Sequence, residues 1–167
     1  MEIGFGRGLF LRHYAKRCPS RFIVGVEIRK TAINLLKQRL SEENIQNVHI
    51  IHGNGEIVLQ DCINDNAIDR LFLFHPDPWL KKRHQKRRII NPGFLDLAYK
   101  KLSKQGKLYI STDVETLWTD IWQTLINHSG FKRIENDPFW DMDYISHWNE
   151  FSEQQNRDIY YAAFARK

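Results

Sequence analysis

The sequence predicts an α/β fold: a Rossmann-like, doubly wound and mostly parallel sheet. Strand-like apolar runs alternate with helical patterns along almost the whole chain of 167 residues. A glycine-rich loop also stands at residues 4–8, between the first strand and the first helix. Since ligands of such sheets bind at the carboxyl ends of the strands, the residues that follow each strand are the first candidates for a site.

Two strands and two helices are expected after the glycine loop. Residues 22–27 (FIVGVE) form the continuous apolar run that a buried parallel strand requires. Thr31 is the expected N-cap of the next helix. The apolar face of that helix comprises Ile33, Leu36 and Leu40. Residues 48–51 predict a short strand, and a turn at residues 53–55 (GNG) starts another helix.

The alternation continues through the middle of the chain. Residues 68–74 predict the next strand. Asn91 and Pro92 mark a helix start, because asparagine is a good N-cap and proline is favoured in the first turn. Gly106 precedes a further strand at residues 107–111.

The clearest helical pattern lies in the last third of the chain, and we expect Gly130 to end it. Its apolar face comprises Leu117, Trp118, Ile121, Trp122, Leu125 and Ile126. A strand is expected at residues 131–134. The aromatic-rich, acidic residues 137–151 predict a loop, and residues 159–164 predict the last strand.

Composition favours a single globular domain over residues 1–167. The hydrophobic fraction of 42% is enough for a core, and no apolar run approaches the roughly 18 residues of a membrane span. Cys18 and Cys62 stand alone and are interpreted as core thiols of a reduced, cytoplasmic protein. The histidines lack zinc-ligand spacing, so we expect no structural metal.

The glycine loop reads EIGFGRG over residues 2–8 and has the features of a ligand loop. Gly4, Gly6 and Gly8 permit positive φ angles and let a ligand approach the backbone closely. The start of the following helix favours a negative group such as a carboxylate. The spacing is G-x-G-x-G, which differs from the dinucleotide pattern.

Two further residues extend this candidate site. Glu27 ends the second strand, where a carboxylate can accept both hydroxyls of a ribose. Asn54 follows the third strand and can contact an adenine edge. Each has a plainer reading: the loop is a turn, Glu27 a solvated strand end and Asn54 a turn residue. The combination of loop and Glu27 favours an adenosine ligand.

The fourth strand runs into the sequence FHPDPW at residues 74–79. Two prolines stiffen this segment and hold Asp77 in one orientation. The alternative is that Asp77 only shapes a turn beside proline. Trp79 either stacks on a base or anchors the loop to the core.

A dense run of positive charge follows directly. The six cations are Lys81, Lys82, Arg83, Lys86, Arg87 and Arg88. Without them the formal net charge of +5 becomes −1, so the basicity of the chain is local. Such a patch indicates a docking surface for a polyanion, although charge runs are often only solvated faces.

Together these motifs and the residues STD at 111–113 closely resemble the tRNA (guanine-N7-)-methyltransferase family of class I S-adenosylmethionine-dependent methyltransferases. The likeness runs along nearly the full chain. The string PDPW followed by LKKRHQKRR is specific to that family, whereas the glycine loop marks only the superfamily. The resemblance implies S-adenosylmethionine as cofactor and tRNA as partner. It implies methylation of guanosine N7, at position 46 of the variable loop.

The resemblance also assigns residues. Contacts with S-adenosylmethionine fall on Glu2, Gly4, Gly6, Gly8, Glu27, Asn54 and Asp77. Lys81 and Asp113 fall on substrate contacts, and the rest of the cation run is expected to grip phosphates without reading sequence. His147 and Glu150 fall on a C-terminal substrate motif, Thr-x-aromatic-Glu. Asp113 is alternatively the N-cap of the following helix.

Three features depart from the family pattern. Asn54 replaces an aspartate, although its amide oxygen can still accept a hydrogen bond from adenine. His147 and Asn149 replace the threonine and the aromatic residue of the last motif. The chain starts at Met1, so the first strand is expected to be truncated to a stub.

The expected chemistry needs no nucleophilic residue. Guanine N7 carries an in-plane lone pair, so catalysis can come from positioning. The purine becomes cationic, and the fixed carboxylate of Asp77 is our candidate for stabilising that charge, with Asp113 and Glu150 orienting the base.

Rival functions remain open at this stage. One is a catalytically impaired, RNA-binding homologue. Another is a class I methyltransferase with a different RNA substrate or a small-molecule substrate. A nicotinamide-dependent oxidoreductase is disfavoured by the glycine spacing. The chain is expected to be a monomer or a homodimer.

Overall fold

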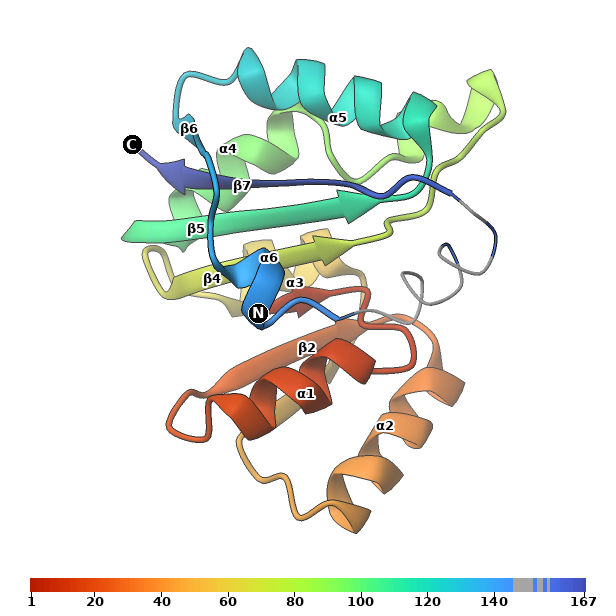
Figure 1. Cartoon of the computed structure of the whole chain (residues 1–167), viewed down its shortest axis with the longest axis vertical. Coiled ribbons are helices and arrows are strands. Elements are labelled where there is room, and N and C mark those ends of the chain that lie inside the picture. The colour runs from red at the N-terminus through yellow and green to blue at the C-terminus, as the bar shows by residue number, and fades with distance from the viewer. Residues whose placement is uncertain (146–151, 153–154, 156) are drawn as a thin grey trace.

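The computed structural model describes residues 1–145, 152, 155 and 157–167, and their strands form one sheet (Figure 1). The strands are β1 (Glu2–Ile3), β2 (Ile23–Glu27), β3 (Val48–His52), β4 (Ile68–Phe74), β5 (Leu102–Thr112), β6 (Phe131–Ile134) and β7 (Tyr160–Arg166). Their order across the sheet is β3-β2-β1-β4-β5-β7-β6. The five strands from β3 to β5 are parallel, and β7 runs antiparallel to both β5 and β6. The predicted mostly parallel sheet is confirmed.

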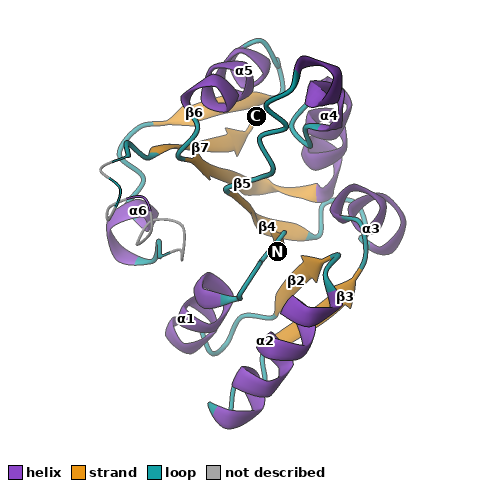
Figure 2. Cartoon of the chain, turned by 90° about the vertical axis from the view of Figure 1, so that its right-hand side faces the viewer, coloured by secondary structure: helices purple, strands orange, loops and turns teal. Residues whose placement is uncertain are grey.

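Helices cover both faces of this sheet (Figure 2). They are α1 (Leu9–Arg17), α2 (Lys30–Glu42), α3 (Gly55–Cys62), α4 (Pro92–Lys101), α5 (Glu115–Ile126) and α6 (Phe139–Met142), and η1 (Lys82–Arg87) is a short 3₁₀ helix. One core cluster joins α1, α2 and α6 to the sheet, and a second joins α3, α4 and α5 to the other face. The doubly wound arrangement is therefore also confirmed.

The alternation of side chains along β4 explains the two cores. Leu71 and Leu73 enter the cluster with α3, α4 and α5, whereas Phe72 and Phe74 enter the cluster with α1, α2 and α6. All four side chains are buried. The strand is therefore apolar on both faces, as a central parallel strand must be.

The first strand is short, as expected. Glu2 and Ile3 pair with Gly25 and Val26 of β2, and Glu2 also pairs with Phe72 of β4. A cavity of about 560 Å³ lies beside Met1, lined by residues of β2 and β4. β1 nevertheless occupies the centre of the sheet and delivers the glycine loop to its carboxyl edge.

Some local predictions are wrong for identifiable reasons. Thr31 does not cap α2, which begins at Lys30 after an N-cap at Arg29 without a side-chain cap. The carboxylate of Glu27 accepts the backbone N–H of Arg29 instead, and the helix starts two residues earlier than predicted. Gly130 does not end α5, whose last residue is Ile126.

The stretch expected to be a loop contains α6. Phe139 is buried, and its ring lies 4.3 Å from the ring of Tyr109 and 5.3 Å from that of Phe72, measured between centroids. Tertiary packing therefore orders a segment with no helical periodicity. Cys62 is exposed and Cys18 half-buried, so the interpretation of core thiols is wrong for Cys62.

Other predictions are confirmed. Asn91 caps α4, because its Oδ1 accepts the N–H of Phe94 at 3.0 Å. The last strand is found at Tyr160–Arg166. Among the described residues, no helix combines the length and the apolarity that crossing a membrane requires.

Candidate functional site

The candidate residues lie at the carboxyl edge of the parallel strands. The glycine loop follows β1, Glu27 ends β2 and Asn54 follows β3. On the other side of β1, Asp77 follows β4 and Asp113 follows β5. Because the strand order reverses between β1 and β4, the loops after these two strands flank the position where such sheets bind ligands.

The glycine loop has the backbone that the sequence predicted. Gly4, Gly6 and Gly8 have φ angles of 76°, 54° and 71°, in the left-handed region. At Gly8 a Cβ atom would stand 2.5 Å from Leu36 Cδ1 in α2, so any side chain there would require Leu36 to move. The loop thus brings its backbone close to α2 and leads directly into α1, which begins at Leu9.

Glu27 is a buried carboxylate held by several donors. Its oxygens accept the backbone N–H groups of Gly6 at 2.9 Å and of Ile28 and Arg29 at 3.0 Å. The side chain of Arg29 donates to both oxygens. Burial raises the pKa of Glu27, but the bonds from Arg29 and Gly6 outweigh it and the net pKa is lowered.

Sequence reasoning missed Arg29, which follows Glu27 by two residues. Its guanidinium Nη2 lies 3.6 Å from the position of a Cβ on Gly6, so it covers the glycine loop. Arg29 therefore occupies hydrogen-bonding positions on the carboxylate that is expected to accept the ribose hydroxyls. The one sequence signal for this role of Arg29 was its position two residues after Glu27, the expected ribose carboxylate.

Glu2, in β1, is a second buried carboxylate next to the glycine loop, and it is 4% exposed. Burial raises its pKa to about 8, with a smaller opposing contribution from the terminal amine. Among the described residues its Oε2 atom has no hydrogen-bond partner. With this raised pKa the carboxyl is largely protonated near neutral pH, and a ligand that brings a positive or N–H group into the loop, as S-adenosylmethionine does, would favour its ionised form.

Asn54 has a structural role in addition to its expected one. Its Oδ1 accepts the N–H groups of Glu56 at 2.9 Å and Ile57 at 3.2 Å, which caps α3. In this structure Asn54 therefore acts as a turn and capping residue, which was the alternative interpretation from the sequence. The contact with adenine stays a prediction, for which the Nδ2 amide remains as a donor.

Asp77 is exposed in the loop after β4 and, within the described part of the chain, makes no hydrogen bond. The pKa of Arg29 is raised mainly by Glu27 but also by the charge of Asp77. The charge of Asp77 therefore reaches Arg29, which lies beside the glycine loop and the expected cofactor residues. The loop is strained, because His75 and Trp79 have φ angles of 47° and 42°.

Trp79 contacts the cation run rather than open solvent alone. The guanidinium of Arg87 lies 5.1 Å from its ring centre, and the ring of His84 packs edge-on at 5.8 Å. The ring is half-buried. These contacts favour the interpretation of Trp79 as an anchor that holds the loop and η1 together.

The cation run divides into two parts. Lys81, Lys82, Arg83, Lys86 and Arg87 are exposed. Arg88 is buried at 7% exposure, which disfavours a contact with RNA phosphates in this conformation, and that contact stays a prediction. Its Nε donates to the carbonyl of Pro78 at 2.9 Å, and its Nη1 pairs with Asp120. Arg88 ties the Asp77 loop to α5.

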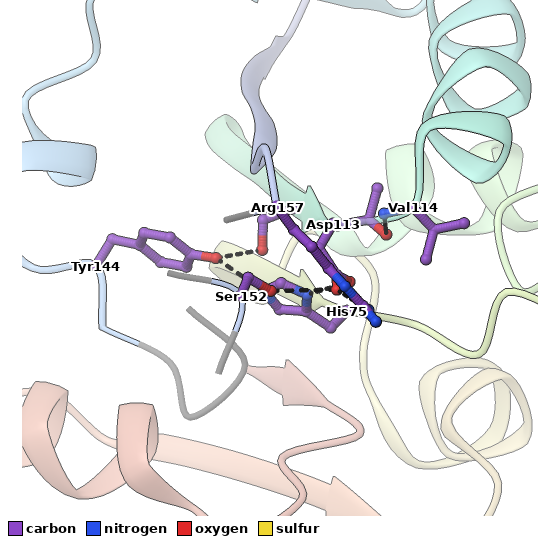
Figure 3. A network of polar contacts seen from close by, with 8 residues as sticks. His75, Asp113, Val114, Tyr144, Ser152 and Arg157 are labelled. Atoms are coloured by element: carbon purple, nitrogen blue, oxygen red, sulfur yellow. Dashed lines mark hydrogen bonds and ion pairs between the residues drawn. The ribbon is translucent and has the colours of Figure 1, made fainter. Parts of the chain in front are cut away.

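Asp113 lies in a network of polar contacts (Figure 3) and does not cap α5. The N-cap is Val114, and its N–H is accepted by Thr112 Oγ1 at 3.2 Å. The Asp113 carboxylate contacts His75 Nδ1 at 3.3 Å and accepts hydrogen bonds from Ser152 Oγ at 3.1 Å and Arg157 Nη1 at 3.2 Å. Sequence reasoning did not predict these partners.

His147 and Glu150, expected to bind substrate, lie outside the described residues, as does Asn149. Across residues 1–145, 152, 155 and 157–167, no group of three or more His, Cys, Asp or Glu side chains is arranged to hold a metal ion. The site is thus built from a glycine loop, carboxylates and exposed cations.

The sheet order, the glycine loop and the buried carboxylates beside it define an α/β protein of the class I methyltransferase type. A solved rRNA methylase from Streptococcus thermophilus superimposes with a TM-score of 0.65 at 14% identity, over 99% of this chain and 85% of that one. A family model described as "Putative methyltransferase" matches residues 1–160. The chain belongs to this methyltransferase family.

Curated relatives are similar at higher identity. A tRNA (guanine-N(7)-)-methyltransferase of Nitrosococcus oceani is 38% identical over 137 residues, which cover 82% of this chain and 58% of the relative. One from Xanthomonas axonopodis pv. citri is 37% identical over 146 residues, which cover 84% of this chain and 56% of the relative. The chain therefore spans little more than half the length of these relatives.

Proposed function

We propose that this protein transfers a methyl group from S-adenosylmethionine to N7 of a guanosine in tRNA, at position 46 of the variable loop. The observation that carries the proposal is Asp77, an exposed carboxylate in the loop after β4 that leads directly into five exposed cations and whose charge acts on Arg29 beside the glycine loop. The curated relatives named above support the substrate. Residues 1–167 are proposed to act as one domain, in the cytoplasm.

The cofactor side of the proposed site comprises the glycine loop, Glu2, Glu27 and Asn54. Glu27 would hold the ribose once Arg29 moves away, and Asn54 would face the adenine. The orphaned Glu2 Oε2 would receive the positively charged part of the ligand. When bound, S-adenosylmethionine supplies an electrophilic methyl group on a sulfonium.

The substrate side would hold guanine by positioning and charge. The N7 lone pair forms the new carbon–nitrogen bond as the sulfur–methyl bond breaks, and the purine takes up the positive charge that leaves sulfur. No proton has to be removed first. Asp77 is proposed to stabilise the cationic purine, and Asp113 to accept N–H groups of the base. The exposed cations would hold phosphates.

The test is methylation of unmodified tRNA by the purified chain with labelled S-adenosylmethionine, followed by nucleoside analysis. The proposal requires label in 7-methylguanosine. Label in another nucleoside would favour a class I methyltransferase with a different RNA position.

Calorimetry with S-adenosylmethionine separates the non-enzymatic rival. A folded chain that binds tRNA but not S-adenosylmethionine would be an RNA-binding homologue without catalysis. The proposal predicts binding of both ligands.

A further inference from the structure

His75 connects the two expected carboxylates of the substrate side, and neither the composition nor the motifs singled it out. It is the first residue after β4 and stands two residues before Asp77. Its backbone has a φ of 47°, and its N–H donates to the carbonyl of Ser111 at 2.8 Å. Non-glycine residues keep such a conformation only where the surroundings hold them in it.

The ring of His75 is held from two sides (Figure 3). Its side chain is only 4% exposed. Nδ1 lies 3.3 Å from Oδ1 of Asp113, and Nε2 lies 3.3 Å from the hydroxyl of Tyr144. That hydroxyl also lies 2.6 Å from Ser111 Oγ. The imidazole therefore joins the ends of β4 and β5 to the segment that follows α6.

We infer that His75 is a positioning residue for methyl transfer: it holds the Asp113 carboxylate and the Asp77 loop in one arrangement, so that both face the same guanine. This inference rests on the proposed function. In this role His75 itself would contact neither the methyl donor nor N7. It acts through Asp113 by its ring and through Asp77 by the backbone turn that it begins.

Electrostatics give the inference a distinctive signature. Burial raises the pKa of Asp113, but the hydrogen bond from His75, the backbone N–H of Asp113 itself, the charge of His75 and the bond from Arg157 outweigh it and lower the net pKa. The described groups that face this carboxylate are His75 from the loop after β4, and Ser152 and Arg157 from the segment before β7. Only an ionised carboxylate accepts N–H groups of a base with both oxygens.

Three substitutions separate the contributions of this side chain. His75→Phe keeps a ring of similar size but loses the polar contacts to Asp113 and Tyr144. His75→Asn keeps a short N–H donor toward Asp113 and suits a positive φ, which asparagine adopts more readily than most residues. Tyr144→Phe removes only the tyrosine hydroxyl that contacts Nε2 of His75.

The experiment is single-turnover methylation of tRNA as a function of pH for wild type and the three variants. We expect His75→Phe to slow transfer by about 10- to 100-fold. The fall of its rate at low pH, the acid limb of the pH–rate profile, should move to higher pH, because without His75 the Asp113 carboxyl protonates more readily. His75→Asn should recover part of the rate and part of the pH shift. Tyr144→Phe should leave the acid limb in place.

Two measurements keep the test independent of folding and of substrate choice. Calorimetric affinity for S-adenosylmethionine should change less than about twofold in His75→Phe, since the glycine loop is separate. NMR titration of the Asp113 carboxyl should show its pKa raised in His75→Phe and partly restored in His75→Asn.

The outcomes are distinct. A slow His75→Phe variant with an unmoved acid limb and no recovery in His75→Asn would mean a purely structural histidine, and the inference falls. An unchanged Asp113 titration overturns it even if wild type is active. A wild type that binds S-adenosylmethionine but does not methylate tRNA overturns the proposed function instead, and with it the assigned role of His75 in methyl transfer.

Discussion

The cofactor side and the substrate side of the site are built in different ways. On the cofactor side, Glu27 bonds the backbone of residues one and two positions along the chain, and of Gly6, 21 positions before it. On the substrate side, His75 contacts Asp113 and Tyr144, which are 38 and 69 positions away. The contacts of the cofactor side thus join residues that are near one another in sequence, whereas those of the substrate side join three segments that are far apart.

This difference determines what each side tolerates. Local backbone donors hold Glu27 wherever β2, the glycine loop and α2 are formed. The substrate side requires that β4, β5 and the segment after α6 come together first. We therefore expect substitutions on the cofactor side to act on ligand affinity, and those on the substrate side to act on rate, RNA binding or stability.

The largest expected effect is the loss of the Asp77 charge. Asp77→Asn should reduce the single-turnover rate by about 100-fold, because a fixed charge near the reacting centre would be removed. Rapid-quench measurements with saturating S-adenosylmethionine and tRNA provide the test. Asp96→Asn is the matched control, since Asp96 is exposed on α4 and pairs with His128. Equal rates for the two variants would exclude Asp77 from the chemistry.

Glu27→Gln tests the local side of the comparison. One oxygen becomes an amide that cannot accept an N–H or a ribose hydroxyl, so S-adenosylmethionine should bind about 10- to 30-fold more weakly. Calorimetry measures the affinity. Glu42→Gln, an exposed carboxylate on α2 that accepts a hydrogen bond from Gln38, should change nothing. A tRNA affinity that fell together with the cofactor affinity would contradict the separation of the two sides.

The exposed cations offer a test of RNA docking. Neutralising Lys86 and Arg87 together should flatten the slope of log affinity for tRNA against log salt by about 1.5, since each phosphate contact contributes roughly 0.7 to 0.9. Filter binding over a range of salt concentrations measures the slope. The control is Lys104→Gln with Lys132→Gln, two exposed residues near the starts of β5 and β6. If both double variants flatten the slope equally, RNA binding is not specific to the cation run.

Substitution of Arg88 has the smallest expected effect, and it acts on the stability of the fold rather than on ligand binding or rate. Arg88→Gln should lower the free energy of unfolding by about 1–2 kcal/mol, because a buried donor to Pro78 and an ion pair to Asp120 are lost. Urea unfolding measures this change. The salt slope for tRNA should remain that of wild type, and a flattened slope would return Arg88 to the RNA surface.

Much of the fold was predictable because its signals are local. The glycine angles, the cap at Asn91 and the apolar runs of β2 and β4 all follow from residues close together in sequence. The predicted loop at residues 137–151 failed where order comes from elsewhere. The helix at Phe139 forms because its ring packs against the rings of Phe72 and Tyr109, which are distant in sequence.

The same contrast holds within the candidate site. The family resemblance assigned Glu2, Glu27 and Asp77 to the candidate site through motifs that are local in the sequence. They gave no signal for Arg29 or His75. Nor could they divide six adjacent cations into five exposed and one buried, since that division depends on where α5 places Asp120.

The sequence by itself determined the sheet, its order of elements and the chemical types of residue at its carboxyl edge, because periodicity and turn chemistry act over a few residues. Only the tertiary structure decided which of those side chains are free and which are held. Burial and hydrogen bonding depend on segments distant along the chain, as the ring of His75 between Asp113 and Tyr144 illustrates.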